Sequence, residues 1–464
     1  MDAQSPFDKQ NITDSRTDAN LKKIFYLLCL LLLIVMIFIV PYHGISGDEV
    51  SQWKYGTSVW NYLKTFGADK TAVSGLYLEN TQTLYGGFFD GFAAMLIDIF
   101  HPKDPFLMRH YWNMLFGFAG IVFSGWLAKE LGGWRAAIIA VIFIVFTPRL
   151  FGEMFNNPKD IPFATGYVAA LLCSIKWLRQ MEAPTWKTTI WLGLSIALAI
   201  SVRIGGVLII AYLGLFWILE MIRIKGFEKK ILGKNIKHLA VAGVIGWLGA
   251  CLFWPYALED IISHPIEAIK VMSAYPLTIK TLFHGEIIWT AIPDYTNIGE
   301  DGKAAIVPNI PGGYLPTWLM IGMPIFILAG FVGALVYLYK WAKTPDRNYY
   351  FLLVFATVFP ILFIIYKKSV VYDGMRHIMF TLPVMVVLAA LFLNSILNML
   401  AAKKPFKYAV IGLTVILVAL PARFMFANFP NEYVYFNELS GGIKSAYGNY
   451  ETDYYFNSLK GGFD

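Results

Sequence analysis

Two adjacent acids follow the first apolar segment of the chain. Asp48 and Glu49 lie in the stretch GISGDEV, a few residues after the uncharged run Ile24–Val40. A carboxylate that is partly removed from water becomes a stronger base, which suits proton abstraction from an attacking group. The pair is therefore a candidate general base, and a solvated loop turn is the alternative.

A second charged stretch, PRLFGEMFNNPKDIP, covers residues 148–162. It contains Lys159 and Asp160 just before Ile161 and Pro162, where a new apolar run begins. An acid at this position also suits the first turn of a helix, since it interacts favourably with the helix dipole. Asp160 is thus a candidate catalytic residue or a helix-start residue, and the sequence leaves both open.

Positive charge gathers in a third stretch, YKKSVVYDGMRH, at residues 366–377. Lys367, Arg376 and His377 lie there within eleven positions, and Arg203 ends another apolar run in SVRIGG. Clustered cations with hydrogen-bond donors bind anions, phosphate above all. Arg203 has an alternative interpretation as a side chain that reaches from the membrane to its interface.

The elements that position these residues are membrane helices. Of the 464 residues, 57% are hydrophobic and 15% are charged, against about 25% charged in a soluble domain. Apolar runs of about 17–25 residues, the length that crosses a bilayer, recur throughout. We predict an all-α polytopic membrane protein with about eleven spans, near 24–42, 108–128, 136–148, 161–178, 188–202, 204–222, 238–256, 315–339, 349–366, 376–398 and 408–425.

The basic residues predict the orientation of these spans. With a cytoplasmic N-terminus, the inside loops hold 21 of the 38 lysines and arginines, six of them in residues 223–237. Cytoplasmic loops are enriched in this way. We therefore predict a cytoplasmic segment 1–23, a first outer loop 43–107, a third outer loop 257–314 and a short outer tail 426–464.

Residues 84–100, LYGGFFDGFAAMLIDIF, do not fit a simple span. They are apolar but include Asp90 and Asp98, and a carboxylate at mid-bilayer costs roughly 2.5–3.5 kcal/mol. We predict a juxtamembrane helix that lies along the outer surface of the membrane.

The outer carboxylates and cations together suggest a single displacement at a sugar carbon, with a lipid phosphate as the leaving group. A lipid-linked phosphate leaves as a stable anion, so its displacement by an acceptor needs positive charge and one carboxylate base. Glycoside hydrolases differ, because they use two opposed carboxyl groups. The net charge of +7 follows from the membrane topology and does not require a nucleic acid, and no metal motif or disulfide framework is visible.

At this point the chain resembles the GT-C glycosyltransferases, in the group of protein O-mannosyltransferases and lipid A aminoarabinose transferases. The similarity extends over nearly the whole chain, in order and spacing. It rests on Gly47-Asp48-Glu49, Asp104-Pro105-Phe106-Leu107-Met108-Arg109, Asn157-Pro158-Lys159-Asp160-Ile161-Pro162, Gly374-Met375-Arg376-His377, and Tyr435-Phe436-Asn437-Glu438-Leu439 with Gly441-Gly442 and Asp453-Tyr454. The family's His-Pro-Pro-like stretch is replaced by Leu84-Tyr85-Gly86-Gly87.

The resemblance implies an inverting transfer of a sugar from a polyprenyl-phosphate donor, by a catalytic membrane domain over 24–425 in a bacterial inner membrane. It implies no metal or other cofactor. Asp48 would be the general base, supported by Glu49 and Asp160. The residues that would hold the phosphate are Lys159, Arg203, Lys367, Arg376 and His377.

Two other classes remain as alternatives. A lipid or solute transporter would carry ionisable residues within its spans and show symmetric halves, whereas a non-catalytic lipid-binding subunit would tolerate changes at the acids. Neither the sugar nor the acceptor, which is a protein, lipid or glycan, follows from the sequence.

Overall fold

The computed structural model describes residues 6–75, 82–273, 277–298 and 304–463, with side chains described between Arg16 and Gly461. The long helices are α1 (Pro6–Ile39), α2 (Glu49–Lys64), α4 (Phe88–Phe100), α5 (Pro105–Val145), α7 (Asp160–Leu178), α8 (Trp186–Ile200), α9 (Val207–Ile224), α10 (Lys229–Cys251), α12 (Ser263–Ser273), α14 (Ile325–Trp341), α15 (Arg347–Tyr366), α16 (Leu382–Met399) and α17 (Lys404–Asn428). The short helices are α6 (Pro148–Gly152), α11 (Pro255–Glu259), α13 (Tyr314–Gly322), α18 (Gly442–Ala446) and α19 (Leu459–Phe463).

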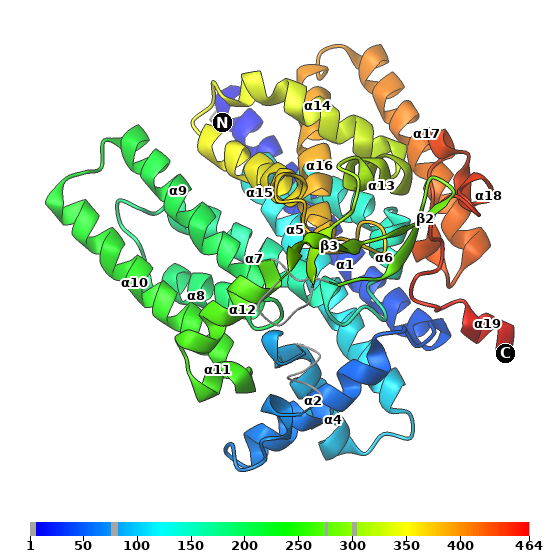
Figure 1. The fold of residues 1–464 in the computed structure, drawn as a ribbon. Coiled ribbons are helices and arrows are strands. Elements are labelled where there is room, and N and C mark those ends of the chain that lie inside the picture. Colours follow the sequence, from blue (N-terminus) through cyan, green and yellow to red (C-terminus); the bar gives the residue numbers. More distant parts are fainter. Residues whose placement is uncertain (1–5, 76–81, 274–276, 299–303, 464) are drawn as a thin grey trace.

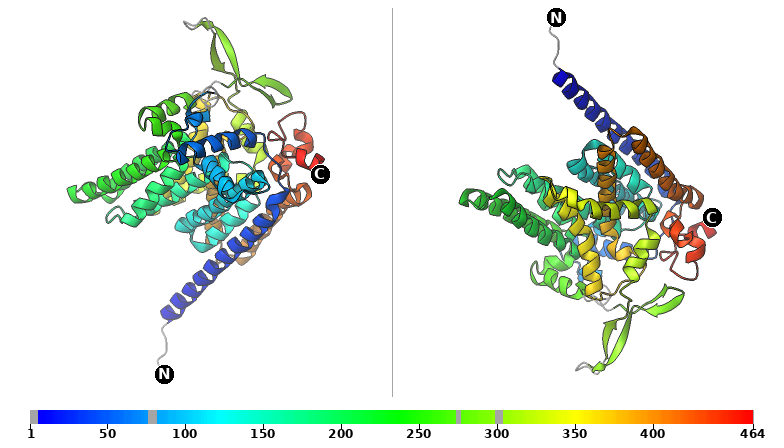
Figure 2. Two further views of the ribbon diagram at one scale, coloured as in Figure 1. Left: turned by 90° about the horizontal axis from the view of Figure 1, so that it is seen from below. Right: turned by 90° about the horizontal axis from the view of Figure 1, so that it is seen from above.

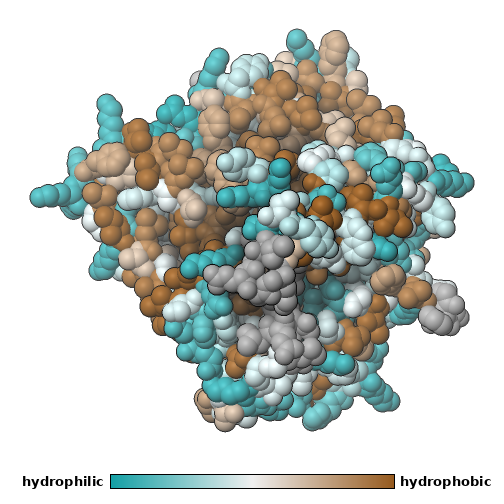
Figure 3. Space-filling model, in the orientation of Figure 1, coloured by the Kyte–Doolittle hydropathy of each residue, from teal (hydrophilic) through white to brown (hydrophobic). Residues whose placement is uncertain are grey.

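The helices form one bundle around α5, α7 and α16 (Figure 1). Helix α7 is 89% buried along its apolar stretch, whereas α17 is only 11% buried. A helix that is apolar on all sides yet exposed faces lipid rather than water. Figure 3 accordingly shows broad hydrophobic patches over much of the visible face.

The predicted count of eleven spans is not confirmed. Among the described residues, six helices are long and apolar enough to cross a membrane: Arg16–Tyr42, Asp160–Leu178, Ile204–Ile224, Arg347–Tyr366, Arg376–Met399 and Lys404–Asn428. A seventh arises if α13 and α14, bent by 120°, count as one span. These helices support a multi-pass membrane protein. The remaining predicted spans also fall on helices, but on shorter or less apolar ones.

Helix α5 covers two of the predicted spans. Its backbone breaks at Gly133, where φ is 75° and ψ is −178°. The left-handed φ suits glycine, which has no Cβ to clash with the backbone. The predicted loop at 129–135 is therefore helical on both sides of a single glycine.

The first predicted outer loop contains α2 and α4, which cross closely (Figure 1). Gly56 of α2 meets the backbone of Asp90, leaving no room for a Cβ, and a Cβ on Gly91 would lie 2.6 Å from Val59. Helix α4 covers only part of the predicted segment 84–100. Asp90, in the first turn of α4, is fully buried within the protein, and the position of this helix along the membrane surface stays a prediction.

The third predicted outer loop contains strands, so the all-α prediction needs correction. Strands β1 (Lys280–Phe283) and β2 (Glu286–Trp289) form an antiparallel hairpin, and β3 (Ala291–Ile298) pairs antiparallel with β4 (Ala304–Pro308). His284 and Gly285 connect β1 to β2 with φ values of 54° and 79°, which is the two-residue turn that matches strand twist. Figure 2 shows the strands and the N-terminal end of α1 at opposite ends of the molecule.

The predicted outer tail packs back onto the bundle. Asn437 donates through Nδ2 to the carbonyl oxygens of Met320 and Met323, at 2.6 and 2.8 Å. The backbone N–H of Gly47 donates to the carbonyl oxygen of Tyr455 at 3.0 Å. The tail therefore contacts the loop that carries Asp48.

Candidate active site

Arg376 is the centre of a charged cluster at one end of the bundle. It begins a 3-10 turn, Arg376–Thr381, that leads directly into α16. Its guanidinium donates to Asp48, to Asp160 at 3.2 Å and to Asp373 at 2.9 Å. The ring of Tyr455 covers it, with 4.9 Å between the guanidinium carbon and the ring centroid. Three carboxylates from distant parts of the sequence thus share one cation.

Asp160 lies at the start of α7, where the helix dipole favours a negative charge. The side-chain oxygen of Asn157 accepts from the backbone N–H of Asp160 at 2.9 Å, so the preceding loop caps the helix. Arg203 donates to the Asp160 carboxylate at 2.5 Å. Asp160 is only 2% exposed. The helix-start interpretation is therefore confirmed. Asp160 also contacts two cations, and its catalytic role stays a prediction.

The same loop continues inward to Glu153, which is fully buried. The amide nitrogen of Asn157 donates to Glu153 at 2.8 Å and to Asp160 at 3.0 Å, and the Tyr454 hydroxyl donates to the other Glu153 oxygen. Burial raises the pKa of Glu153 to about 7, although these hydrogen bonds oppose the effect. Burial likewise raises the pKa of Asp373, and Arg376 beside it partly offsets the rise.

A second buried ion cluster joins α4 to α5. Asp90 accepts from Arg109 at 2.8 Å and from Lys159 at 2.5 Å. The side chains of Asp90 and Arg109 are 0% exposed, and that of Lys159 is 7% exposed. A buried carboxylate is tolerated when cations neutralise it, which explains how a helix with Asp90 can pack inside the protein.

The two adjacent acids have different environments. The Asp48 side chain is 38% exposed, whereas Glu49 is 1% exposed. Glu49 accepts hydrogen bonds from the backbone N–H of Ser46 at 2.7 Å and from Nε2 of His110 at 3.1 Å. Asp48 therefore presents its carboxylate to a cavity, while Glu49 holds the start of α2 against α5.

Two cavities adjoin at this cluster. The polar one, about 370 Å³, is lined by Asp48, Ser51, Gln52, Tyr55, Gln82, Tyr85, Lys159, Arg203, Leu277, Ile279, Tyr372, Asp373 and Arg376. The other, about 250 Å³, has mostly apolar walls from Leu84, Phe163, Leu208, Phe363, Phe380 and their neighbours. Tyr85 and Arg203 line both cavities. A polar compartment thus opens beside an apolar one, with a cation at their boundary.

The structure brings together most residues predicted for the site. Asp48, Lys159, Arg203 and Arg376 line the polar cavity, and His377 lines the apolar one. Nδ1 of His377 has no hydrogen-bond partner among the residues that the structure describes. Lys367 is different: it is exposed at the end of α15 and forms no ion pair within the described part of the chain.

Sequence reasoning missed four members of this site: Asp90, Glu153, Asp373 and Tyr455. Asp373 had a usable signal, because it precedes Arg376 by three residues in the same basic stretch. Asp90 had an opposing signal, since the cost of a carboxylate in lipid argued for the membrane surface. Tyr455 had none, as nothing local places residue 455 beside residue 376.

No group of three or more histidine, cysteine, aspartate or glutamate side chains is arranged to hold a metal ion, within the described residues. That observation does not test whether the reaction needs a metal, and the absence of a cofactor stays a prediction. The three cysteines are free thiols.

Comparisons with known proteins support the resemblance seen in the sequence. A family model described as dolichyl-phosphate-mannose-protein mannosyltransferase matches residues 25–248. The curated proteins provide no match. Among solved structures, ArnT from Cupriavidus metallidurans in the apo state has a TM-score of 0.52 at 13% identity, over 80% of this chain and 60% of that chain.

Two further structures are similar to the same degree. ArnT bound to undecaprenyl phosphate has a TM-score of 0.52 at 13% identity, over 92% of this chain and 75% of that chain. The apo oligosaccharyltransferase of Archaeoglobus fulgidus has a TM-score of 0.52 at 14% identity, over 91% and 56%. The chain spans about 60% of the length of ArnT in the apo state, the first structure described above. At such low identity the similarity concerns the fold. The resemblance predicted from the sequence is confirmed: this chain has the fold of the GT-C glycosyltransferases and resembles the protein mannosyltransferases over residues 25–248.

Proposed function

We propose that this protein transfers a sugar from a polyprenyl-phosphate-linked donor to a hydroxyl or amine of an acceptor, on the outer face of the membrane. One observation carries the proposal: Asp48 and three cations line a polar cavity that adjoins an apolar one. A lipid-linked sugar has the same sequence of polar and apolar parts. The fold shared with ArnT, which has been solved with undecaprenyl phosphate bound, supports this assignment.

The donor would lie across the boundary of the two cavities. Its prenyl chain would occupy the apolar cavity beside Phe163 and Phe380, and its sugar would enter the polar one. Arg203 lines both cavities, so its guanidinium is suited to the phosphate between them. Arg376 and Lys159 add positive charge from the polar side.

The reaction would be a single displacement at the anomeric carbon. The acceptor oxygen or nitrogen forms a bond to that carbon while the bond from carbon to phosphate oxygen breaks. The acceptor proton passes to the Asp48 carboxylate, and the polyprenyl phosphate leaves as an anion held by the cations. Attack opposite to the leaving group inverts the anomeric configuration. We assign this role to the Asp48 carboxylate because its side chain lines the polar cavity and is 38% exposed to solvent.

The other predicted acids would act by positioning. Asp160 is 2% exposed and holds Arg203 and Arg376, so it orients the phosphate-binding cations. Glu49 fixes the turn that carries Asp48 through its bonds to Ser46 and His110. Lys367 would meet a donor only outside the two cavities, so we assign it the weakest part in phosphate binding.

We further propose that the segment 24–425 is the catalytic membrane domain, with residues 1–23 in the cytoplasm and the tail 426–464 outside. The site is supplied by segments that the charge pattern predicts to be outside: Asp48 in the loop after α1, Asp160 at the start of α7, and Arg376 in the turn that leads into α16. A bacterial inner membrane would then present the site to the periplasm, where protein, lipid and glycan acceptors are available.

The test uses the purified protein in detergent with two donors of the same sugar, one linked to polyprenyl phosphate and one to a nucleotide. The acceptor is first identified by mass spectrometry of cell-envelope lipids and proteins from a strain without the gene. With that acceptor, we expect release of polyprenyl phosphate together with glycosylation of the acceptor. Transfer from the nucleotide donor alone would contradict the proposal, as would binding of the polyprenyl-linked donor without any cleavage of it in the presence of the acceptor.

A further inference from the structure

A larger groove lies between α5, α7 and α8, apart from the two cavities of the site. Its volume is about 830 Å³, within the range of roughly 300–1,000 Å³ typical of small-molecule pockets. Helix α7 provides the floor, and α5 and α8 provide the walls. The apolar lining consists of Phe123, Trp126, Ala169, Leu172, Cys173, Trp191, Leu194 and Leu198.

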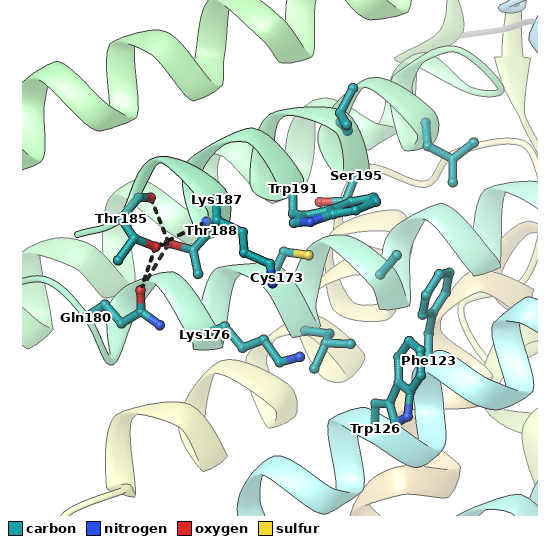
Figure 4. A pocket seen from close by; sticks show the side chains of 14 residues that line it. Phe123, Trp126, Cys173, Lys176, Gln180, Thr185, Lys187, Thr188, Trp191 and Ser195 are labelled. Carbon is teal, nitrogen blue, oxygen red and sulfur yellow. Dashed lines mark hydrogen bonds between the residues drawn. The ribbon is translucent and has the colours of Figure 1, made fainter. Parts of the chain in front are cut away.

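One end of the groove is polar. Lys176 and Lys187 line it together with Gln180, Thr185 and Thr188. In Figure 4 the Lys187 side chain extends from this end towards Cys173, and the Lys176 side chain lies below Cys173. The ammonium of Lys176 lies 3.8 Å from Glu130, whereas Lys187 has no ion pair in the part of the chain that the structure describes.

The polar end is remote from the candidate active site. Asp160 and Lys176 lie sixteen positions apart on the continuous helix α7, which corresponds to about 24 Å along its axis. That length approaches the thickness of a bilayer core, roughly 30 Å. The loop at 176–187 is therefore at the opposite membrane face, which the basic residues predict to be cytoplasmic.

Aromatic side chains mark the boundary between the polar and apolar parts. Trp126 and Trp191 line the groove on opposite walls, and Trp191 is 58% exposed. Tryptophan favours the level of lipid headgroups, where its ring is amphipathic. Lysines just beyond that level attract the anionic headgroups of the cytoplasmic leaflet.

We propose that this groove is a binding site for an anionic phospholipid of the cytoplasmic leaflet. The phosphate lies between Lys176 and Lys187, and one acyl chain follows the apolar floor past Cys173 between Trp126 and Trp191. The charge of the lysines favours an anionic over a zwitterionic headgroup. The site is separate from the proposed donor site, so it stands whether or not the transferase assignment is correct.

The test is native mass spectrometry of the full-length protein released from nanodiscs of equal parts phosphatidylglycerol and phosphatidylcholine. The wild type is expected to retain phosphatidylglycerol preferentially. The double variant Lys176→Gln/Lys187→Gln should lose this preference, with a drop of about fivefold or more per lysine in relative retention. The variant Cys173→Phe, which fills the groove, should retain less of both lipids.

The matched control is Lys229→Gln/Lys230→Gln, which removes the same charge from exposed positions on the same predicted side, outside the groove. It should behave as the wild type. An equal loss in this control, or an unchanged preference in the groove variant, would overturn the assignment. Displacement of phosphatidylglycerol by an equimolar amount of undecaprenyl phosphate would also overturn it. Melting curves of each variant show whether it remains folded.

Discussion

Removing the charge of Asp90 should destabilise the protein without touching the cavity directly. Asp90→Asn leaves Arg109 and Lys159 without their shared carboxylate, at positions that are 0% and 7% exposed. Loss of one partner of a buried ion pair costs about 3–5 kcal/mol. If all 464 residues unfolded together, their unfolding entropy would be about 1 kcal/mol per degree, so the melting temperature should fall by about 3–5 °C, and by more if unfolding is partial.

The assay is thermal unfolding of the purified protein in detergent, followed by intrinsic fluorescence. Asp98→Asn is the matched control, because Asp98 lies on the same helix and its contacts with Trp60 and Lys64 are exposed to solvent. We expect that control to melt with the wild type. Equal melting temperatures for Asp90→Asn and Asp98→Asn would refute the argument that Asp90 holds α4 in the bundle.

Two further predictions concern the active-site cluster. Arg376→Ala should weaken binding of undecaprenyl phosphate about tenfold or more, because it removes a charge-assisted contact worth roughly 1.5–3 kcal/mol. Binding of the acceptor should change less. Titration of this variant and of Lys367→Ala, an exposed control, measures the effect, and equal affinities of the two variants for undecaprenyl phosphate would argue against it. Burial raises the pKa of Glu153 from 4.5 to about 7. Between these two pH values the folded protein holds a proton that the unfolded chain has released, so the free energy of unfolding falls by up to about 1.4 kcal/mol for each unit that the pH rises. Glu153→Gln should remove this loss, so melting curves of variant and wild type should diverge from pH 5 to pH 7 in favour of the variant, and parallel curves would contradict it.

Hydropathy located the helices because lipid requires long apolar runs with all backbone groups bonded internally. It could not count the spans reliably. The break in α5 is a single residue, Gly133, where a loop had been expected. The bend of 120° between α13 and α14 likewise leaves no mark in the hydropathy of one continuous predicted span.

The charged residues were located by type and spacing, but their partners were not. The prediction for Asp90 used the cost of a lone carboxylate, whereas the folded chain supplies Arg109 and Lys159 to neutralise it. Adjacent acids look alike in sequence, and only packing separates Asp48 in the cavity from Glu49 beneath it.

The contribution of the tail was beyond reach of local patterns. Tyr454 bonds to Glu153 across 301 residues, and Tyr455 covers Arg376. Such contacts depend on how the chain returns to the bundle after α17. The strands in the third predicted outer loop were missed for a related reason: they are short, and β1 and β2 are held partly by tail residues such as Tyr450, which bridges to Phe283.

The most direct test of the account is sugar transfer by Asp48→Asn from a polyprenyl-phosphate donor under single-turnover conditions, with donor binding measured in parallel. The substitution keeps the shape of the side chain and removes its ability to take the acceptor proton. Transfer should fall about a hundredfold or more, the usual contribution of a general base, while the donor still binds. Transfer near the wild-type rate, with donor fully bound, would contradict the role assigned to Asp48.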